Sequence, residues 1–362
     1  MQFSQKSKEH IDSCRFCWMC HHICPIGNAT GLERNTARAR ALGLSLVTRE
    51  AIEYSDDIVA NVYECSLCGG CVADCTTGWD PVMFAKEARL VAALEDKLPS
   101  YITKMIENLG AKGNIYGLDK NDDLTKLIAS LKDSDTLLFL GEDATYKAPE
   151  CAINAINLLK NNGVDFTVLA NEPNSGFTMD FMVGAAEDTK DVMKECAKAL
   201  SKFKTVVCYD GADAKVMKRE YKEWGVELSA NVVTFTEFIA SLIKDGKLNV
   251  KNNGKEYTIQ DSYLLARDLE ETEPVREIIS ACGKVNEMLL NRKGTMLAGH
   301  LIMNEYMPKA IEEVAKNRWI NAINMNAKVV VTANTAEYVM LKKTKPEGVE
   351  VKTIEEVVAE CL

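Results

Sequence analysis

Eight of the thirteen cysteines in this 362-residue chain fall into two copies of one spacing, C-x2-C-x2-C-x3-C. The first copy spans residues 14–24 and the second spans residues 65–75. Thiolates at this spacing can reach three corners of one 4Fe–4S cubane from a single tight loop, and the fourth corner must be capped from elsewhere. The spacing therefore predicts iron–sulfur clusters, which carry single electrons.

The pattern resembles that of bacterial two-cluster ferredoxins, in which the fourth cysteine of each run ligates the other cluster. The resemblance implies a cluster one held by Cys14, Cys17, Cys20 and Cys75, and a cluster two held by Cys65, Cys68, Cys71 and Cys24. Pro25 follows the first run as in that family, whereas the second run continues with Thr76. Gly69 and Gly70 lie inside the second loop, where close backbone approach to a cluster favours glycine. The crossed ligation would join two distant segments, so we expect the metal to stabilise the N-terminal fold.

Three other cysteine chemistries compete with this interpretation. C-x2-C pairs also bind zinc, but zinc sites normally use two spaced pairs and a tetrahedral site has no use for a further cysteine three residues on. The segment 17–21 fits the haem-attachment pattern C-x-x-C-H, but it is embedded in a denser cysteine run and no secretory signal precedes it. Disulfides need an oxidising compartment, and nothing in the sequence indicates export.

Composition narrows the class of protein. The net charge of −10 argues against nucleic acid as a partner. No stretch approaches 18 apolar residues, so no transmembrane helix is expected, and residues 1–6 lack the apolar core of a signal peptide. We therefore expect a cytoplasmic protein, in an anaerobic or low-oxygen cell that suits exposed cubanes. The other cysteines show no C-x-x-C spacing and are expected to be small buried thiols: Cys151, Cys196, Cys208, Cys282 and Cys361.

Residues 1–100 are predicted to form an α-helical ferredoxin domain with two 4Fe–4S clusters, because the segment between the cysteine runs has helical character. Helices are expected over residues 33–42, ending at Gly43, and again from Thr48 onward. A third is expected from Pro81 to Leu94, with Asp80 as its N-cap. Residues 101–134 are predicted to be a helical connector.

The remaining residues are predicted to form two α/β halves, residues 135–250 and 251–362. The expected strands are 136–140, 166–169, 205–209, 257–259, 328–332 and 349–351, and the expected helices are 149–162, 213–224, 274–290 and 307–324. Short strands separated by helices of about 10–15 residues imply parallel sheets, so we expect two Rossmann-like repeats. No Gly-x-Gly-x-x-Gly fingerprint or Walker loop is present, so we expect the chain itself to bind no flavin or nucleotide.

This layout resembles the iron–sulfur subunits of glycolate oxidase, anaerobic glycerol-3-phosphate dehydrogenase and lactate-utilisation complexes, and also heterodisulfide reductase subunits. The resemblance includes the arginine-bearing segment 36–40 and the segments 146–150 and 161–166. In that family each C-terminal repeat carries a Cys-Cys-Gly motif whose cysteines can hold a further iron–sulfur centre. Here the corresponding segments 174–176 and 297–300 read Asn-Ser-Gly and Leu-Ala-Gly-His, and Cys208 has lost its companion. The resemblance therefore implies degenerate Cys-Cys-Gly repeats, with no cluster in residues 135–362 and no heterodisulfide chemistry.

Polar residues stand where the family would place thiols or their neighbours. If the family fold holds, five of them are expected to converge: Glu142, Asn174, Asp261, His300 and Asn334. Such a pocket could bind a small ligand or a loop of a partner protein. The alternative is a vestigial, hydrogen-bonded interior, because convergent polar groups are only probabilistic pointers to function.

The resemblance implies an iron–sulfur electron-transfer subunit in a cytoplasmic anaerobic oxidoreductase complex. It would relay single electrons between a flavoprotein (FAD) dehydrogenase or reductase and another redox partner, such as a further electron-transfer protein. A flavin exchanges two electrons and a cubane carries one, so a two-cluster module suits this relay. The alternatives are a scaffold or redox-sensing subunit whose clusters are mainly structural, and a self-contained reductase. We expect a non-catalytic subunit, since the sequence shows no nucleophile–base pair in the C-terminal part.

Overall fold

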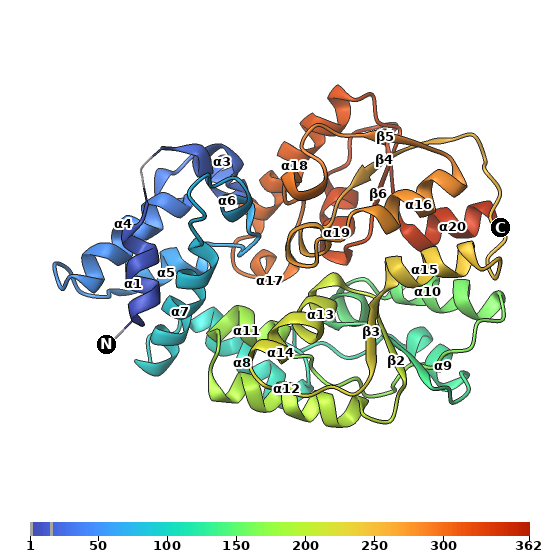
Figure 1. The fold of residues 1–362 in the computed structure, drawn as a ribbon, viewed down its shortest axis with the longest axis horizontal. Helices are drawn as coiled ribbons and strands as arrows, with labels where there is room; N and C mark the ends of the chain where they lie inside the picture. Colours follow the sequence, from blue (N-terminus) through green and yellow to red (C-terminus); the bar gives the residue numbers. More distant parts are fainter. Residues whose placement is uncertain (1–2, 15–16) are drawn as a thin grey trace.

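The structure is a computed structural model that describes residues 3–14 and 17–362. Helices of the N-terminal region gather at one end of the molecule, and two small parallel sheets with their helices form the other end (Figure 1). No helix in the described part of the chain is long and apolar enough to cross a membrane.

The described N-terminal region is built from helices, as expected. They are α1 (Gln5–Asp12), α2 (Met19–Ile23), α3 (Pro25–Thr30), η1 (Glu33–Asn35), α4 (Ala37–Thr48), α5 (Asp56–Tyr63), α6 (Gly70–Ala73) and α7 (Pro81–Leu94). Helix α7 begins and ends where the sequence predicts, because the Asp80 carboxylate accepts hydrogen bonds from the N–H groups of Val82 and Met83. The prediction that Gly43 ends a helix is wrong: α4 runs through Gly43, and the next helix begins at Asp56 rather than Thr48.

Two helices, α8 (Ser100–Lys112) and α9 (Asp122–Ala129), lead to the first sheet. This sheet contains β1 (Thr136–Phe139), β2 (Thr205–Cys208) and β3 (Asn231–Thr234), paired in parallel in that order. The expected strand at 166–169 is reduced to one parallel bridge between Leu137 and Thr167. The surrounding helical segments are η2 (Asp143–Lys147), α10 (Pro149–Asn161), α11 (Phe177–Val183), α12 (Glu187–Leu200), α13 (Gly211–Lys215), η3 (Val216–Glu220), α14 (Tyr221–Glu223) and α15 (Phe235–Lys244).

The second sheet has the parallel order β5-β4-β6-β7. Its strands are β4 (Glu256–Gln260), β5 (Lys284–Glu287), β6 (Val329–Thr332) and β7 (Glu350–Thr353). Its helical segments are η4 (Leu264–Asp268), α16 (Glu273–Cys282), η5 (Arg292–Gly294), α17 (Leu301–Asn304), α18 (Pro308–Asn324), α19 (Thr335–Thr344) and α20 (Ile354–Cys361).

The expected helix 274–290 is too long, because α16 ends at Cys282 and β5 follows. A Cβ on Gly283 would lie 2.5 Å from the carbonyl oxygen of Lys255, so only glycine allows this close approach between the chain segments. The tight approach lets the chain leave the helix and enter the sheet beside β4.

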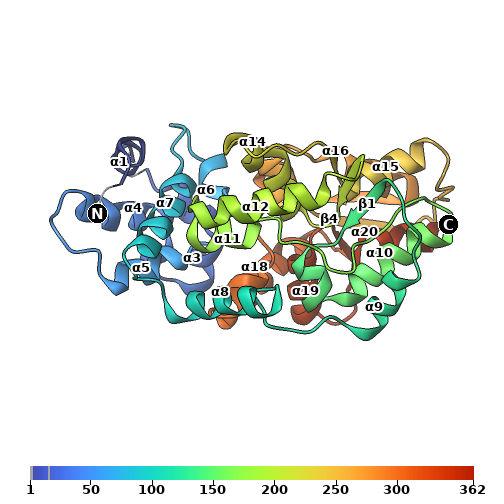
Figure 2. The ribbon, with the colours of Figure 1, turned by 90° about the horizontal axis from the view of Figure 1, so that it is seen from below.

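The N-terminal helices pack against both sheet regions. Helix α3 lies against α18 of the second sheet region, and α7 lies against α11 of the first (Figures 1 and 2). One hydrophobic core crosses this junction and includes Ile26, Phe84, Phe181, Leu301 and Ala315. The cysteine runs are therefore held in a region whose core is shared with the α/β part.

Candidate iron–sulfur centres

Four cysteines from the two runs line one cavity between α3, α6 and α7. They are the residues expected to hold cluster two: Cys24, Cys65, Cys68 and Cys71. The cavity occupies about 450 Å³, part of it open to solvent, and its wall is otherwise mainly apolar, with Ile26, Ala37, Val82, Phe84 and Ala85. The fold thus brings the last cysteine of the first run beside the first three cysteines of the second run.

The surroundings of these thiols favour the protonated form when no metal is bound. The Cys24 sulfur accepts a hydrogen bond from the N–H of Gly27 at 3.4 Å, at the start of α3. Burial raises the pKa of Cys24, and burial together with the neighbouring thiols raises the pKa of Cys71 well above its ordinary value. Without a metal these sulfurs would keep their protons, and metal binding would release them.

The two runs form the same local turn. In the second run Gly69 has φ +70° and precedes α6, and in the first run Trp18 has φ +68° and precedes α2. Both residues occupy the same place in the spacing, directly after the second cysteine of the run. A bulky residue rarely adopts this left-handed conformation, so the position is set by the turn rather than by the side chain.

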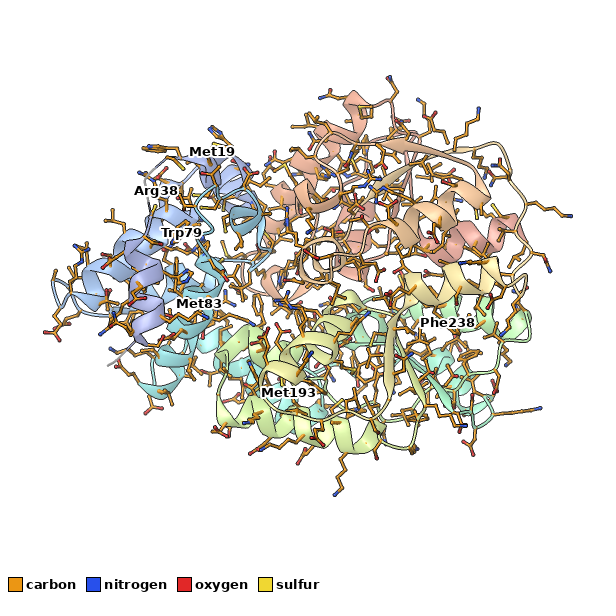
Figure 3. All side chains as sticks on the ribbon, viewed as in Figure 1. Met19, Arg38, Trp79, Met83, Met193 and Phe238 are labelled. Atoms are coloured by element: carbon orange, nitrogen blue, oxygen red, sulfur yellow. The ribbon has the colours of Figure 1, made fainter. Side chains whose placement is uncertain are left out.

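The cysteines of the first run lie nearer the surface. Cys17 is exposed and Cys14 is half-buried, whereas Cys20 on α2 is buried. Burial, with smaller contributions from Cys14, Cys17 and Cys24, raises the pKa of Cys20 to about 11, so these cysteines lie close together. Arg15 and Phe16, inside the run, lie outside the described residues. Met19 and Arg38 project at the outer edge of this region (Figure 3).

Cys75 is the residue expected to complete cluster one. Its sulfur lies 3.2 Å from the hydroxyl of Thr77. Partial burial acts to raise the pKa of Cys75, but hydrogen bonds from Thr77, Trp79 and Gly78 outweigh it and lower this pKa. Such a sulfur is a ready thiolate ligand. The contacts described for Cys75 lie within its own turn, so its place in cluster one stays a prediction.

The donor set fits a 4Fe–4S cluster at the cluster two site. Four sulfurs from two separate segments converge on one mainly apolar cavity, which is the arrangement that cross-ligated cubanes require. When bound, such a cluster supplies one-electron redox chemistry. The protein's part is to hold the sulfurs, exclude water and set the local charge.

The five polar residues of the C-terminal part do not form one pocket. Asn174 donates to the Glu142 carboxylate beside the first sheet, and this is the only pair of the five that the described contacts bring together. Asp261 belongs to the second sheet region and accepts two hydrogen bonds from Arg276, at 2.7 and 2.9 Å. The expected convergence fails because these residues follow strands of two different sheets.

The remaining two have local structural roles. His300 is the N-cap of α17, and its ring lies 4.8 Å from that of Phe181. Burial, with a smaller contribution from the Arg89 charge, lowers the pKa of His300 to about 3, so the ring is neutral. Asn334 caps α19 by accepting a hydrogen bond from the N–H of Glu337 at 2.9 Å. Asn334 therefore fits the interpretation of a hydrogen-bonded interior, whereas the Nε2 of His300 is buried without a hydrogen-bond partner among the described residues.

Sequence reasoning missed an acidic cavity at the carboxyl ends of β1 and β2. It occupies about 590 Å³, partly open to solvent, and is lined by Glu142, Asp143, Glu172, Asp210 and Asp213, with Lys120. Burial raises the pKa of Glu142 and of Glu172 to about 7. The signal in the sequence was an acidic residue shortly after each of two apolar strands, since carboxyl ends of parallel strands meet at one edge.

Sequence reasoning also missed two buried arginines beside the cluster two site. Arg40 on α4 lines the cavity itself, and Arg89 on α7 donates to the carbonyl oxygen of Cys65 at 2.6 Å. Both lie on helices that the sequence predicted in whole or in part. Their direction toward the cysteines depends on tertiary packing.

Comparison with known proteins identifies the N-terminal region. Residues 10–79 match the family model of a 4Fe-4S dicluster domain. This match supports an iron–sulfur, metal-binding region of ferredoxin type and an electron-transfer role, which implies redox partners. The match spans both cysteine runs, at residues 14–24 and 65–75.

The other comparisons give weaker likenesses. No curated protein matches the chain. Among solved structures, an aspartate racemase from Picrophilus torridus has 12% identity and a TM-score of 0.31, covering 63% of this chain and 92% of that one. An aspartate racemase homologue from Pyrococcus horikoshii has 12% identity and a TM-score of 0.30, covering 63% of this chain and 96% of that one. Neither likeness bears on function.

Proposed function

We propose that this chain is the iron–sulfur electron-transfer subunit of a cytoplasmic, anaerobic oxidoreductase complex. It relays single electrons between a flavoprotein (FAD) dehydrogenase or reductase subunit and another redox partner. The observation that carries the proposal is the convergence of Cys24 with Cys65, Cys68 and Cys71 on one cavity. That set joins the two cysteine runs in the crossed manner of two-cluster ferredoxins.

The relay uses two 4Fe–4S clusters that lie close together. Cluster one takes Cys14, Cys17, Cys20 and Cys75, and cluster two takes the four cysteines of the cavity. Cys20 contributes to the raised pKa of Cys71, and Cys24 contributes to that of Cys20, so the two sites adjoin. Adjoining clusters allow a two-electron donor to be oxidised one electron at a time.

The C-terminal part serves the complex without a metal of its own. We infer that the two sheets are degenerate Rossmann-like repeats of the kind found in Cys-Cys-Gly proteins. In support, each sheet ends in a strand that leads into a helix whose first-turn glutamate accepts from the N–H of the N-cap threonine. Glu237 accepts from Thr234 at 3.0 Å and Glu356 from Thr353 at 2.9 Å. The cysteines there are buried, and Cys208 has only the sulfur of Met217 as a described partner, at 3.8 Å.

Iron and acid-labile sulfide per chain, measured on protein purified anaerobically, test the cofactor content. We expect about eight irons and two interacting cubane signals in the EPR spectrum of the dithionite-reduced protein. About twelve irons would contradict the metal-free C-terminal part, and zinc in place of iron would contradict the relay itself.

The flavoprotein partner needs a separate test. The tagged chain, purified anaerobically from its own cells, is expected to bring with it a stoichiometric FAD protein. Reducing that flavin with the substrate of the complex should then reduce the clusters of this chain. A complex that contains no flavin, or whose reduced flavin leaves the clusters oxidised, would contradict the partner assignment and leave the cluster assignment standing.

A further inference from the structure

Arg40 is a buried cation in the wall of the cluster two cavity. Its side chain is on α4, and the residue is 3% exposed. It donates from Nε to the carbonyl oxygen of Asn61 at 2.9 Å and from Nη2 to that of Glu64 at 2.8 Å. The Glu64 carboxylate pairs with the exposed Arg34 at 2.9 Å. Arg40 is therefore held by dipoles and not by a carboxylate.

Arg89 is a second buried cation next to the site. It is fully buried and donates to the carbonyl oxygens of Cys65 at 2.6 Å and Phe181 at 2.6 Å. Its guanidinium lies over the rings of Tyr63 and Phe181, at 4.9 and 4.4 Å from their centroids. Its Nε has no hydrogen-bond partner among the described residues. The neighbouring His300 is neutral, so it adds no charge beside Arg89. A third arginine, Arg267, is part-buried and donates to the carbonyl oxygen of Cys68 at 2.8 Å.

Neither arginine forms an ion pair with a carboxylate in the described parts of the chain, 3–14 and 17–362. The second sheet region contains both arrangements. Buried Arg276 pairs with Asp261 at 2.7 Å and with Glu287 at 2.7 Å. Buried Arg318 instead donates to the side chain of Gln260 and to backbone carbonyl oxygens. A charge taken out of water without a counter-charge costs several kcal/mol in order of magnitude. What sets Arg40 and Arg89 apart is that they lie beside four converging thiols, and metal-bound thiolates are an anionic group that this site can provide.

We propose that Arg40 and Arg89 are the counter-charges of the cluster held by Cys24, Cys65, Cys68 and Cys71, and that they raise its reduction potential. This inference rests on the proposed function, since it requires a cluster at that site. A cubane with four thiolates is anionic and becomes more so when it accepts an electron. Burial disfavours the added charge, and two nearby fixed cations in a low-dielectric interior offset that penalty.

The test is a potentiometric titration of the full chain with both clusters in place, followed by EPR. Arg40→Gln and Arg89→Met are expected to lower one midpoint potential and leave the other unchanged. We expect at least a tenfold change in the equilibrium constant for reduction, which is about 59 mV for a one-electron couple. Arg40→Lys and Arg89→Lys, which keep the charge, are expected to retain most of the potential.

Arg34→Gln is the matched control. Arg34 lies on the same region of the chain and pairs with Glu64, but half of its side chain is exposed, so water screens its charge. Neither midpoint should move in this variant. A shift as large as that of Arg40→Gln would show that the effect is a general change of surface charge, and would overturn the proposal.

The other outcomes are also decisive. Unchanged midpoints in the neutral variants would overturn the counter-charge role. If a neutral variant loses iron, retention of iron by the matching lysine variant supports the proposal, and loss of iron from both shows a packing role and overturns it. The unsubstituted protein distinguishes failure of the counter-charge proposal from failure of the proposed function. If the unsubstituted chain lacks two reducible clusters, the proposed function itself is wrong.

Discussion

The loop at residues 17–20 and the loop at residues 68–71 share one backbone turn and differ in what surrounds it. Each places a left-handed residue between its second and third cysteine, Trp18 in the first and Gly69 in the second. Around the first loop, Cys17 is exposed, and Arg38 stacks on the Trp18 ring at 3.6 Å while pairing with Glu33. The second loop lines an apolar cavity beside a cation that has no carboxylate partner.

The comparison separates the geometry of a site from how readily the site accepts an electron, and the cysteine spacing alone cannot distinguish these two properties. The spacing sets the turn, and the turn aims the sulfurs. The exposure of the sulfurs and the nearest charges then set how readily each site accepts an electron. We expect the cluster one site to be the contact with a redox partner, because it lies nearer the surface, and the cluster two site to be tuned by the protein interior.

The largest expected effect comes from Cys24→Ser, which tests whether the runs are crossed. This change should lower the iron content from about eight to about four per chain and destabilise the N-terminal helices, because metal binding is coupled to folding. Combining it with Cys71→Ser should remove no further iron, whereas combining it with Cys20→Ser should remove the rest. Iron analysis and EPR measure both outcomes.

The control for this experiment is Cys208→Ala, at a buried cysteine far from either run in sequence. Its iron content should equal that of the unsubstituted chain. The reverse pattern, in which adding Cys71→Ser to Cys24→Ser removes the remaining iron and adding Cys20→Ser removes none, would contradict the crossed assignment, since Cys24 would then ligate cluster one.

The next effect is a difference in the pH dependence of cluster assembly. Burial raises the pKa of Cys24 and, with the neighbouring thiols, raises that of Cys71, whereas hydrogen bonds lower the pKa of Cys75. Iron binds thiolates, so a site whose thiols have raised pKa values must release more protons and fills only at higher pH. The cluster one site also contains a thiol with a raised pKa, Cys20. It stands there together with Cys75, whose pKa is lowered, whereas the cluster two site has two thiols with raised pKa values and should therefore fill at higher pH.

Reconstitution with iron and sulfide between about pH 6 and pH 9 would measure this difference, since thiols titrate in and above that range. The Cys20→Ser variant retains the cluster two site, and Cys24→Ser retains the cluster one site. If the Cys20→Ser variant assembles its cluster at a lower pH than the Cys24→Ser variant does, burial does not control the protonation of these sulfurs.

A smaller effect is expected from adding one methyl group to the shared turn. Gly69→Ala should destabilise the protein by about 1–2 kcal/mol, because an L-residue is strained at positive φ. Space is not the cause, since the added Cβ would meet only the Arg267 side chain, at an ordinary 3.7 Å. Anaerobic urea unfolding followed by circular dichroism gives the change in free energy.

Gly43→Ala is the matched control with the opposite sign. Gly43 lies in the interior of α4, where its added Cβ would meet no atom within 4 Å. Alanine there should stabilise the helix by about 0.5–1 kcal/mol. If both substitutions destabilised the protein, backbone conformation would not explain the loss at Gly69.

These positions also show what the sequence could predict. Local chemistry was sufficient to predict α7, where an acidic cap and a proline define the first turn. It was also sufficient to predict iron–sulfur ligation from the cysteine spacing. It failed at Gly43, because a lone glycine ends a helix only where the chain needs a left-handed residue. It failed again at Gly283, where the close approach of Lys255 depends on a neighbouring strand.

The candidate site shows the same division. The resemblance to two-cluster ferredoxins implied the cluster two ligands, and the structure places Cys24, Cys65, Cys68 and Cys71 around one cavity. The spacing gave no sign that Arg40 and Arg89 face those sulfurs, since their carbonyl partners lie 21 to 92 residues away in the chain. Nor could it separate Glu142 from Asp261, which follow similar strands in different sheets.

The smallest expected effect is that of Trp18→Gly, the reciprocal of Gly69→Ala. Glycine at φ +68° should relieve about 1–2 kcal/mol of backbone strain. The substitution also removes the stack of Arg38 on the indole, worth about 0.5–1 kcal/mol at an exposed site, and adds chain entropy to the unfolded state. These contributions oppose each other, so the free energy of unfolding should change by less than about 1 kcal/mol, measured as for Gly69→Ala.

A large stabilisation would show that Trp18 is kept for a purpose other than stability, which at this exposed ring beside cluster one would be contact with a redox partner. A large destabilisation would show that the two turns are not equivalent.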